Sequence, residues 1–350
     1  MSKRDHVFIG ICYLLWVALL VPSSFPDPQY TDFYPLWFGA HALLAGQDPY
    51  SAGVSSALRE SWLVVRTHQV SAVVAYPLPF LVLLAPLAML PLSWAGPLWF
   101  ALSVGLALTG LWLLTREICT ERSQKFLYLL PIVSYPLFHA AVIKTSSVLV
   151  LGILALMVWA DRRNHRVLCG ILMVLALCKP QMSLVLVGYT LLHRLRREKL
   201  TLGVFLSGCL IFWGWTFFIQ PDWVQVWLKV LKLYMRNSVN VSLLPQGLLA
   251  VALLFLLRAP ALTQLALLQT VIFPVNDIYS TLPLIIGWVS LNSNYSALGA
   301  AIAWAAPAYY VFPNNPDTIR ALIIVPYVLS ALYVKTGPWL RDRLAQSGAR

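Results

Sequence analysis

The sequence predicts an all-α integral membrane protein, a polytopic helix bundle of about 12 spans. Hydrophobic residues make up 59% of the 350 residues, and charged residues make up only 11%. The mean hydropathy is +0.75, whereas soluble domains carry about 25% charged residues. The apolar residues form runs separated by short basic or proline-containing loops. This pattern is typical of spanning helices and not of the alternating strands of a membrane barrel.

Twelve apolar runs are expected to span the membrane. A single helix needs about 20 apolar residues to cross, and helices broken by proline inside a bundle need fewer. The first run, which follows a basic start, also fits a secretory signal, but its poor cleavage site favours a retained span. The runs are 7–22, 94–115, 126–142, 146–160, 167–178, 182–193, 201–219, 242–257, 261–275, 280–290, 295–311 and 319–334.

The apolar stretch 73–92 contains four prolines and is predicted to be re-entrant or to lie at the membrane surface. This assignment places 17 of the 25 Lys and Arg residues on the cytoplasmic side, in agreement with the positive-inside rule. The sequence therefore predicts one polytopic domain over 1–350 with both termini cytoplasmic. Its long first outer loop, 23–93, contains interfacial or re-entrant helices, and 220–241 forms a second outer loop.

The distribution of charge excludes several classes of function. The net charge is +12, but the Lys and Arg residues stand in small clusters between apolar runs and leave no basic face for a nucleic acid. The five cysteines show no metal-ligand spacing. Seven acidic residues fall on the predicted outer side and none falls in the middle of a span. Ion carriers usually place a carboxylate within the bundle, so chemistry at the outer surface is favoured over transport.

The second outer loop contains the stretch "QPDWVQVWLKVLKLYMRNSVN". Aromatic and apolar residues recur there at helical spacing, while Lys229, Lys232 and Arg236 share another face. The pattern predicts an amphipathic helix at the membrane interface. Its basic face either anchors the helix to anionic lipid or contacts a lipid-linked phosphate.

Two lysines and two aspartates are candidates for chemistry. Lys179, between the apolar runs "ILMVLALC" and "MSLVLVGY", either snorkels to the outer surface or binds an anionic phosphate as a point charge. Lys144 permits the same two interpretations with less force. Asp32 precedes a helical stretch, so Thr31 or Asp32 could cap that helix; next to apolar aromatics, the Asp32 carboxylate could instead act as a general base. Asp48, before Pro49, is a turn residue.

Three motifs, "TDFYPLWFGAHALLAGQDPYS", "YPLPFLVLLAPLAMLPL" and "CKPQMSLVLVGYTLLHRLRR", occur in this order. In residues and spacing they resemble glycosyltransferase family 87, clearly over residues 1–200 and only in hydrophobic pattern beyond. The resemblance implies the C-type glycosyltransferase fold in the inner membrane of a bacterium. It also implies transfer of a mannose-like hexose from a polyprenyl-phosphate-sugar donor to a hydroxyl of a glycan or glycolipid acceptor. The reaction would occur on the extracytoplasmic face and invert the configuration of the sugar.

The resemblance assigns Asp32 as the catalytic base. No cofactor is expected, and no metal either, because Asp27 and Asp32 with Pro28 between them make a poor chelating pair. The other candidates are Lys179, Lys144 and Gln181 for the donor phosphate, and Tyr34, Asn276, Asp277 and Tyr279 for the sugar or acceptor. The alternatives are a transporter or flippase of a lipid-linked saccharide, a non-catalytic scaffold, and an inactive relative, since Asn276 stands where members often carry histidine.

Overall fold

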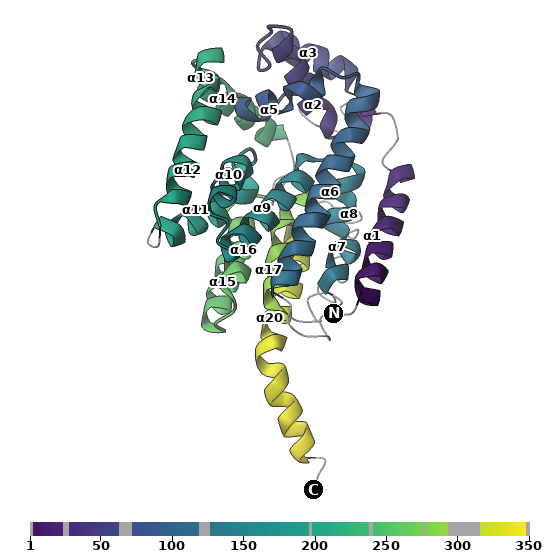
Figure 1. Ribbon diagram of the computed structural model, residues 1–350, viewed down its shortest axis with the longest axis vertical. Coiled ribbons are helices and arrows are strands. Elements are labelled where there is room, and N and C mark those ends of the chain that lie inside the picture. Colours follow the sequence, from purple (N-terminus) through teal and green to yellow (C-terminus); the bar gives the residue numbers. More distant parts are fainter. Residues whose placement is uncertain are drawn as a thin grey trace. The chain divides into compact units, whose positions relative to one another are not determined.

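The structure is a computed structural model, and its regular elements are helices throughout the described residues (Figure 1). An isolated antiparallel bridge between Val241 and Val275 is the exception. The predicted all-α class is confirmed for these residues. The structure describes residues 3–23, 28–62, 72–118, 127–195, 198–237, 241–275, 277–292 and 316–347.

Three helical segments in the described part of the chain are long and apolar enough to cross a membrane. They are Leu92–Ile118, Leu200–Ile219 and Asp317–Thr336. Shorter apolar helices accompany them. The predicted run 295–311 lies outside the described residues, and the number of twelve spans stays a prediction.

Most other predicted runs coincide with helices to within a few residues. Those before residue 200 are α1 (Lys3–Ser23), α6 (Leu92–Ile118), α9 (Ser146–Arg162), α10 (Arg166–Ala176) and α11 (Pro180–Leu195). Those after residue 240 are α15 (Gln246–Leu256), α16 (Ala261–Ile272) and α17 (Pro283–Leu291). The predicted run 319–334 lies within a helix that is much longer at its C-terminal end, α20 (Pro316–Ser347).

Two runs are interrupted where a single helix was expected. The run 126–142 divides at Ser134 into α7 (Leu130–Val133) and α8 (Tyr135–Val142). Pro131 and Pro136 lie near the starts of these helices, where a missing N–H is tolerated. The run 201–219 begins as α12 (Leu200–Cys209), passes through a π-helical turn and ends as α13 (Thr216–Ile219).

The described chain forms two compact units. The first unit consists of Met1–Trp16, Leu111–Phe138 and Val241–Arg350. In it α17 packs on α16, α20 and α7. A Cβ on Gly287 would overlap the hydroxyl of Tyr327, and this hydroxyl donates to the Thr263 carbonyl over 2.8 Å. A glycine therefore permits the close approach of α17 and α20.

The second unit, Val17–Gly110 with His139–Asn240, contains most of the candidate residues. Its helical core consists of α9, α10, α11 and α12, with α10 in contact with the other three. Helices α6 and α9 meet at two glycines: a Cβ on Gly152 would lie 2.6 Å from the Ala107 nitrogen, and one on Gly110 would lie 2.6 Å from the Gly152 oxygen. Small residues allow this close approach of the two backbones.

The described residues of the predicted first outer loop include three helices of the second unit. These are α2 (Phe33–Leu44), α3 (Ala52–Ser61) and α5 (Leu78–Ala88). Helix α2 packs on α5, and the Trp37 indole donates to the Leu90 carbonyl over 3.2 Å. The eleven residues of α5 span about 16 Å, less than the hydrocarbon core of about 30 Å. Whether this segment is re-entrant or interfacial stays a prediction.

Candidate functional site

Asp32 immediately precedes α2 and is half-buried. It occupies the N-cap position with a helical backbone (φ −67°, ψ −13°), but its side chain makes no capping hydrogen bond. The capping interpretation is therefore wrong for the Asp32 carboxylate. The main chain of this residue is held instead: its N–H donates to the Ile143 carbonyl over 2.9 Å.

Asp48 acts as the turn residue that the sequence predicts. Its Oδ1 accepts the N–H of Tyr50 over 2.9 Å and the side-chain amide of Gln220 over 3.4 Å. Helix α2 has already ended at Leu44, and Gly46 adopts a φ of +73°. Asp32 and Asp48 thus have different environments, because the Asp48 carboxylate forms a local turn.

Lys179 lies directly before α11 and is only 8% exposed. Its Nζ donates to Ser147 Oγ over 2.6 Å and to Ser146 Oγ over 3.3 Å. Because the ammonium points to buried hydroxyls, the snorkelling interpretation is wrong. Both serines lie in the first turn of α9, whose N-cap is Thr145. A helix N-terminus and an ammonium group both favour a negatively charged ligand.

Lys144 lies in the turn between α8 and α9 and is 1% exposed. Its backbone has a φ of 55°, and its carbonyl accepts the Trp99 indole N–H over 2.9 Å. Burial lowers the pKa of its ammonium group, because a low-dielectric surrounding disfavours the charged form. The short segment 143–147 therefore holds the backbone of Asp32 at one end and the ammonium of Lys179 at the other.

Tyr76, which was not predicted as a site residue, lies between these two ends. Its hydroxyl donates to the Asp32 carbonyl over 3.3 Å, and it interacts with the Ser146 side chain, which lowers the Tyr76 pKa. Its only sequence signal is a tyrosine before proline in a short non-helical segment, which many loops share. The structure brings together Asp32, Lys144, Lys179 and Tyr76, with Ser146 between the last two.

The remaining predicted residues have less direct relations to this cluster. Tyr34, the second residue of α2, is buried, and its ring stacks near Trp37 with centroids 6.1 Å apart. Gln181, the second residue of α11, is exposed. Both belong to the same compact unit as Asp32.

The later outer turn belongs to the other compact unit. Asn276 lies outside the described residues, as does Asp27. Asp277 is half-buried and precedes a short 3₁₀-helix, Ile278–Thr281, without a side-chain cap. Its carboxylate acts electrostatically on Tyr135. Tyr279 is 7% exposed.

The second outer loop forms the predicted amphipathic helix, α14 (Trp223–Asn237). Trp223 is 1% exposed, and the Trp227 indole donates to the Ala75 carbonyl over 3.1 Å. The basic residues Lys229, Lys232 and Arg236 are exposed. The helix is confirmed, and its position at a membrane interface stays a prediction.

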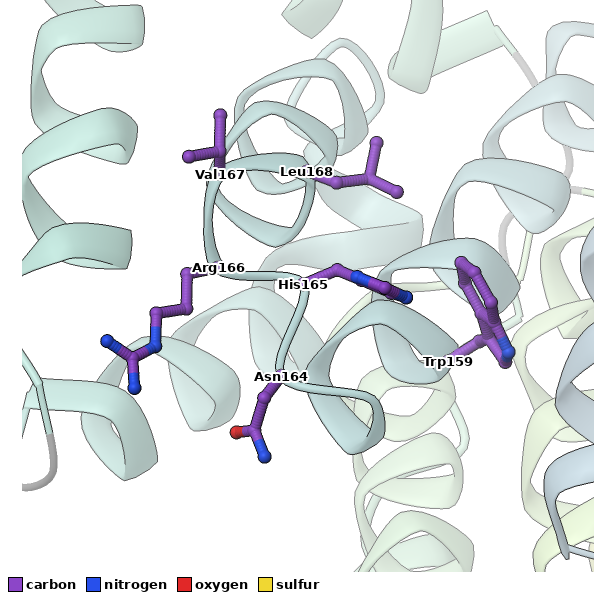
Figure 2. Close-up of a pocket in the computed structure, with 6 residues that line it drawn as sticks. All are labelled: Trp159, Asn164, His165, Arg166, Val167 and Leu168. Carbon is purple, nitrogen blue, oxygen red and sulfur yellow. The ribbon is translucent and has the colours of Figure 1, made fainter.

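A pocket of about 510 Å³ opens at the other end of α9. Figure 2 shows the His165 and Trp159 rings facing one another, with centroids 5.1 Å apart. With 17 residues, α9 separates this pocket from Ser146 by about 25 Å. The pocket is therefore distinct from the cluster around Asp32. It is lined by Trp159, Asn164, His165, Arg166, Val167 and Leu168.

An ion-pair network beside this pocket was not expected from the sequence, which assigned the basic residues here only to topology. Arg194 is 5% exposed, and its guanidinium lies 2.5 Å from Asp161 and 3.4 Å from Glu198. Glu198 also pairs with Arg166 over 2.6 Å. Because these charges neutralise one another, we interpret the network as structural.

Comparison with known proteins identifies the family. The model of glycosyltransferase family 87 matches residues 74–334. No curated protein and no solved structure matches the chain. The family match contains Tyr76, Lys144 and Lys179 but begins after Asp32, and it extends well beyond residue 200, where the sequence alone suggested only a shared hydrophobic pattern. Since the match covers most of its length, the chain belongs to glycosyltransferase family 87 and is a glycosyltransferase.

Proposed function

We propose that this glycosyltransferase transfers a mannose-like hexose from a polyprenyl-phosphate donor to an acceptor hydroxyl at the outer face of a bacterial inner membrane. The observation that carries the proposal is the position of the buried Lys179 ammonium, which donates to Ser146. Ser146 interacts with Tyr76, whose hydroxyl donates to the main-chain carbonyl of Asp32. A carboxylate and an ammonium in one small region match the two charges that such a transfer handles.

Asp32 is the base of the proposed reaction. Its carboxylate takes the proton of the acceptor hydroxyl while the acceptor oxygen forms a bond to the anomeric carbon. The bond from that carbon to the phosphate oxygen breaks on the opposite face, and polyprenyl phosphate leaves with the electron pair. The configuration is inverted, and Asp32 ends the step protonated. A carboxylate that does not cap its helix remains able to accept this proton.

Lys179 stabilises the phosphate. The leaving phosphate gains negative charge in the transition state, so a fixed cation beside it lowers the barrier. The ammonium is held by Ser146 and Ser147 at the first turn of α9, where the helix dipole also favours an anion. Lys144 and Gln181 are the further candidates for the phosphate, and Tyr34, Asn276, Asp277 and Tyr279 remain the candidates for the sugar and acceptor.

The test is transfer by the purified protein. The protein is incubated with a panel of polyprenyl-phosphate sugars and a membrane lipid extract as the source of acceptors, and release of polyprenyl phosphate is followed by mass spectrometry. Asp32→Asn is expected to abolish release while the protein still folds and inserts. The matched control is Asp48→Asn. It removes a carboxylate in the same loop, one that forms a turn, and the variant is expected to keep transfer activity.

Two outcomes contradict parts of the proposal. Full activity of Asp32→Asn removes Asp32 as the base. No release of polyprenyl phosphate from any donor by the folded wild-type protein rejects the donor class and favours an inactive relative.

A further inference from the structure

Asp32 is held through both of its main-chain groups. Its N–H donates to Ile143, which stands next to Lys144, and its carbonyl accepts the hydroxyl of Tyr76, 44 residues away in the sequence. These bonds fix the Cα of Asp32 without using its carboxylate. The Asp32 main chain is therefore held by the Tyr76 side chain and by the turn that contains Ile143.

Tyr76 is itself held firmly. The Tyr50 hydroxyl donates to the Tyr76 carbonyl over 2.8 Å, and the Trp227 indole of α14 donates to the preceding carbonyl, that of Ala75. The Tyr76 ring meets Phe80 edge to face with centroids 5.9 Å apart. Three different segments thus fix the backbone and ring that carry the hydroxyl.

The hydroxyl of Tyr76 does not serve as an acid or base. Burial raises the pKa of Tyr76 far above its ordinary value, and Asp32 and Tyr234 raise it further, while the interaction with Ser146 lowers it. The phenol therefore stays neutral at any working pH and remains a hydrogen-bond donor. Its contacts suit a group that sets distance and orientation.

We propose that Tyr76 is a positioning residue that holds the base Asp32 at a defined place relative to the phosphate-binding Lys179. The inference rests on the proposed function, because it assigns Tyr76 a role in that reaction. Its hydroxyl touches Asp32 on one side and Ser146 on the other, and Ser146 accepts from Lys179. Loss of the hydroxyl removes the hydrogen bond from Tyr76 to the Asp32 main chain.

The test is Tyr76→Phe, which keeps the ring and its contact with Phe80. We expect kcat to fall about 10-fold, the effect of one lost hydrogen bond of ordinary strength, while the KM for the polyprenyl-phosphate donor stays within about 2-fold of wild type because Lys179 is intact. If Tyr76 served only folding, Tyr76→Phe would lower the thermal midpoint of unfolding but would not lower kcat while KM stays unchanged.

Tyr13→Phe is the matched control. Tyr13 also donates a part-buried hydroxyl to a distant carbonyl, that of Tyr128, over 2.7 Å, in the other compact unit. The Tyr13→Phe variant is expected to lose about as much stability as Tyr76→Phe and to keep the wild-type kcat. If Tyr76→Phe does not fold, Tyr50→Phe, which frees the Tyr76 carbonyl, replaces it with the same expected separation and a smaller fall in kcat.

The outcomes separate this inference from the proposed function. An inactive Asp32→Asn together with wild-type kcat in Tyr76→Phe overturns the positioning role and leaves the proposed function intact. Equal falls in kcat for Tyr76→Phe and Tyr13→Phe also overturn it, because a general loss of stability then explains both. Transfer by Asp32→Asn contradicts the proposed function itself.

Discussion

Two buried lysines in one small region are costly for a folded chain. Lys144 is 1% and Lys179 is 8% exposed, and moving an ammonium out of water is strongly unfavourable. The serine hydroxyls around Lys179 accept hydrogen bonds from its ammonium. In the proposed function, a phosphate would add a charge-assisted hydrogen bond to the same ammonium.

Lys179→Met is therefore expected to harm substrate use more than folding. We expect kcat/KM for the polyprenyl-phosphate donor to fall about 10- to 100-fold, the worth of a hydrogen bond to a charged group. The thermal midpoint is expected to hold or rise, because an apolar side chain of similar length suits a buried position. Kinetics and thermal unfolding in detergent measure the two quantities.

The control for this substitution is Lys199→Met, at an exposed lysine before α12. It removes the same charge from the surface and is expected to leave kcat/KM unchanged. Equal kinetics of Lys179→Met and wild type would exclude Lys179 from the phosphate site.

At the scale of single residues, sequence reasoning found the charged groups but not what holds them. Asp48 was predictable as a turn residue because its contact with Tyr50 is local. The role of Tyr76 was not, because its bond to Asp32 joins residues 44 positions apart. The burial of Lys179, which excludes snorkelling, was not predictable either. It depends on contact with α9, and this contact forms only in the folded chain.

Helix packing in the second unit depends on glycine at the contact between α6 and α9. A Cβ on Gly152 would lie 2.6 Å from the Ala107 nitrogen and from the Leu106 carbonyl carbon. Both neighbours are backbone atoms, which cannot rotate away as a side chain can. The two helices must therefore separate when a larger residue replaces Gly152.

Gly152→Ala is expected to lower the free energy of unfolding by about 1–3 kcal/mol, the usual cost of overpacking. Thermal unfolding in detergent measures the loss. Gly203→Ala in α12 is the control, because a Cβ there meets nothing within 4 Å. It is expected to hold or raise stability, since alanine favours a helix by about 1 kcal/mol over glycine. An equally stable Gly152→Ala would show that α6 and α9 do not pack through these glycines.

At the scale of helices, hydrophobic runs predicted most elements because continuous apolar stretches of this length have few alternatives to a helix. The prediction missed the break at Ser134 and the π-helical turn at Leu210–Gly214. Both interruptions lie inside apolar sequence, where hydropathy does not change. Helix α14 was predictable from its amphipathic pattern, but the hydrogen bond from its Trp227 indole to the Ala75 carbonyl was not.

In the second compact unit, two groups of polar residues lie at opposite ends of α9. One end holds Lys179 and the network that reaches Asp32, and the other holds the ion pairs of Arg194 and the pocket in Figure 2. A helix of 17 residues is about 25 Å long, close to the thickness of a hydrocarbon core of about 30 Å. The two ends are thus far enough apart to face opposite sides of a membrane.

The proposed transfer on the extracytoplasmic face requires the Asp32 end of α9 to lie on the outer side of the membrane. The positive-inside rule predicts that the basic loop 161–166 is cytoplasmic, so the Asp32 end of α9 and helix α14 are expected to face outward. Single cysteines test this orientation in a chain whose five native cysteines are replaced by alanine. Lys229→Cys and Arg163→Cys are suitable, because both side chains are exposed.

We expect a membrane-impermeant maleimide to label Lys229→Cys in intact spheroplasts, and to label Arg163→Cys only after the membrane is permeabilised. Lys199→Cys, in the second predicted cytoplasmic loop, is expected to behave like Arg163→Cys and controls for local reactivity. The reverse pattern would place the Asp32 end in the cytoplasm, which contradicts transfer on the extracytoplasmic face but leaves the chemistry of Asp32 and Lys179 unchanged. Labelling of both ends from one side would instead mean that α9 does not separate the two faces, since no 25 Å helix crossing the core can expose both ends to the same solution.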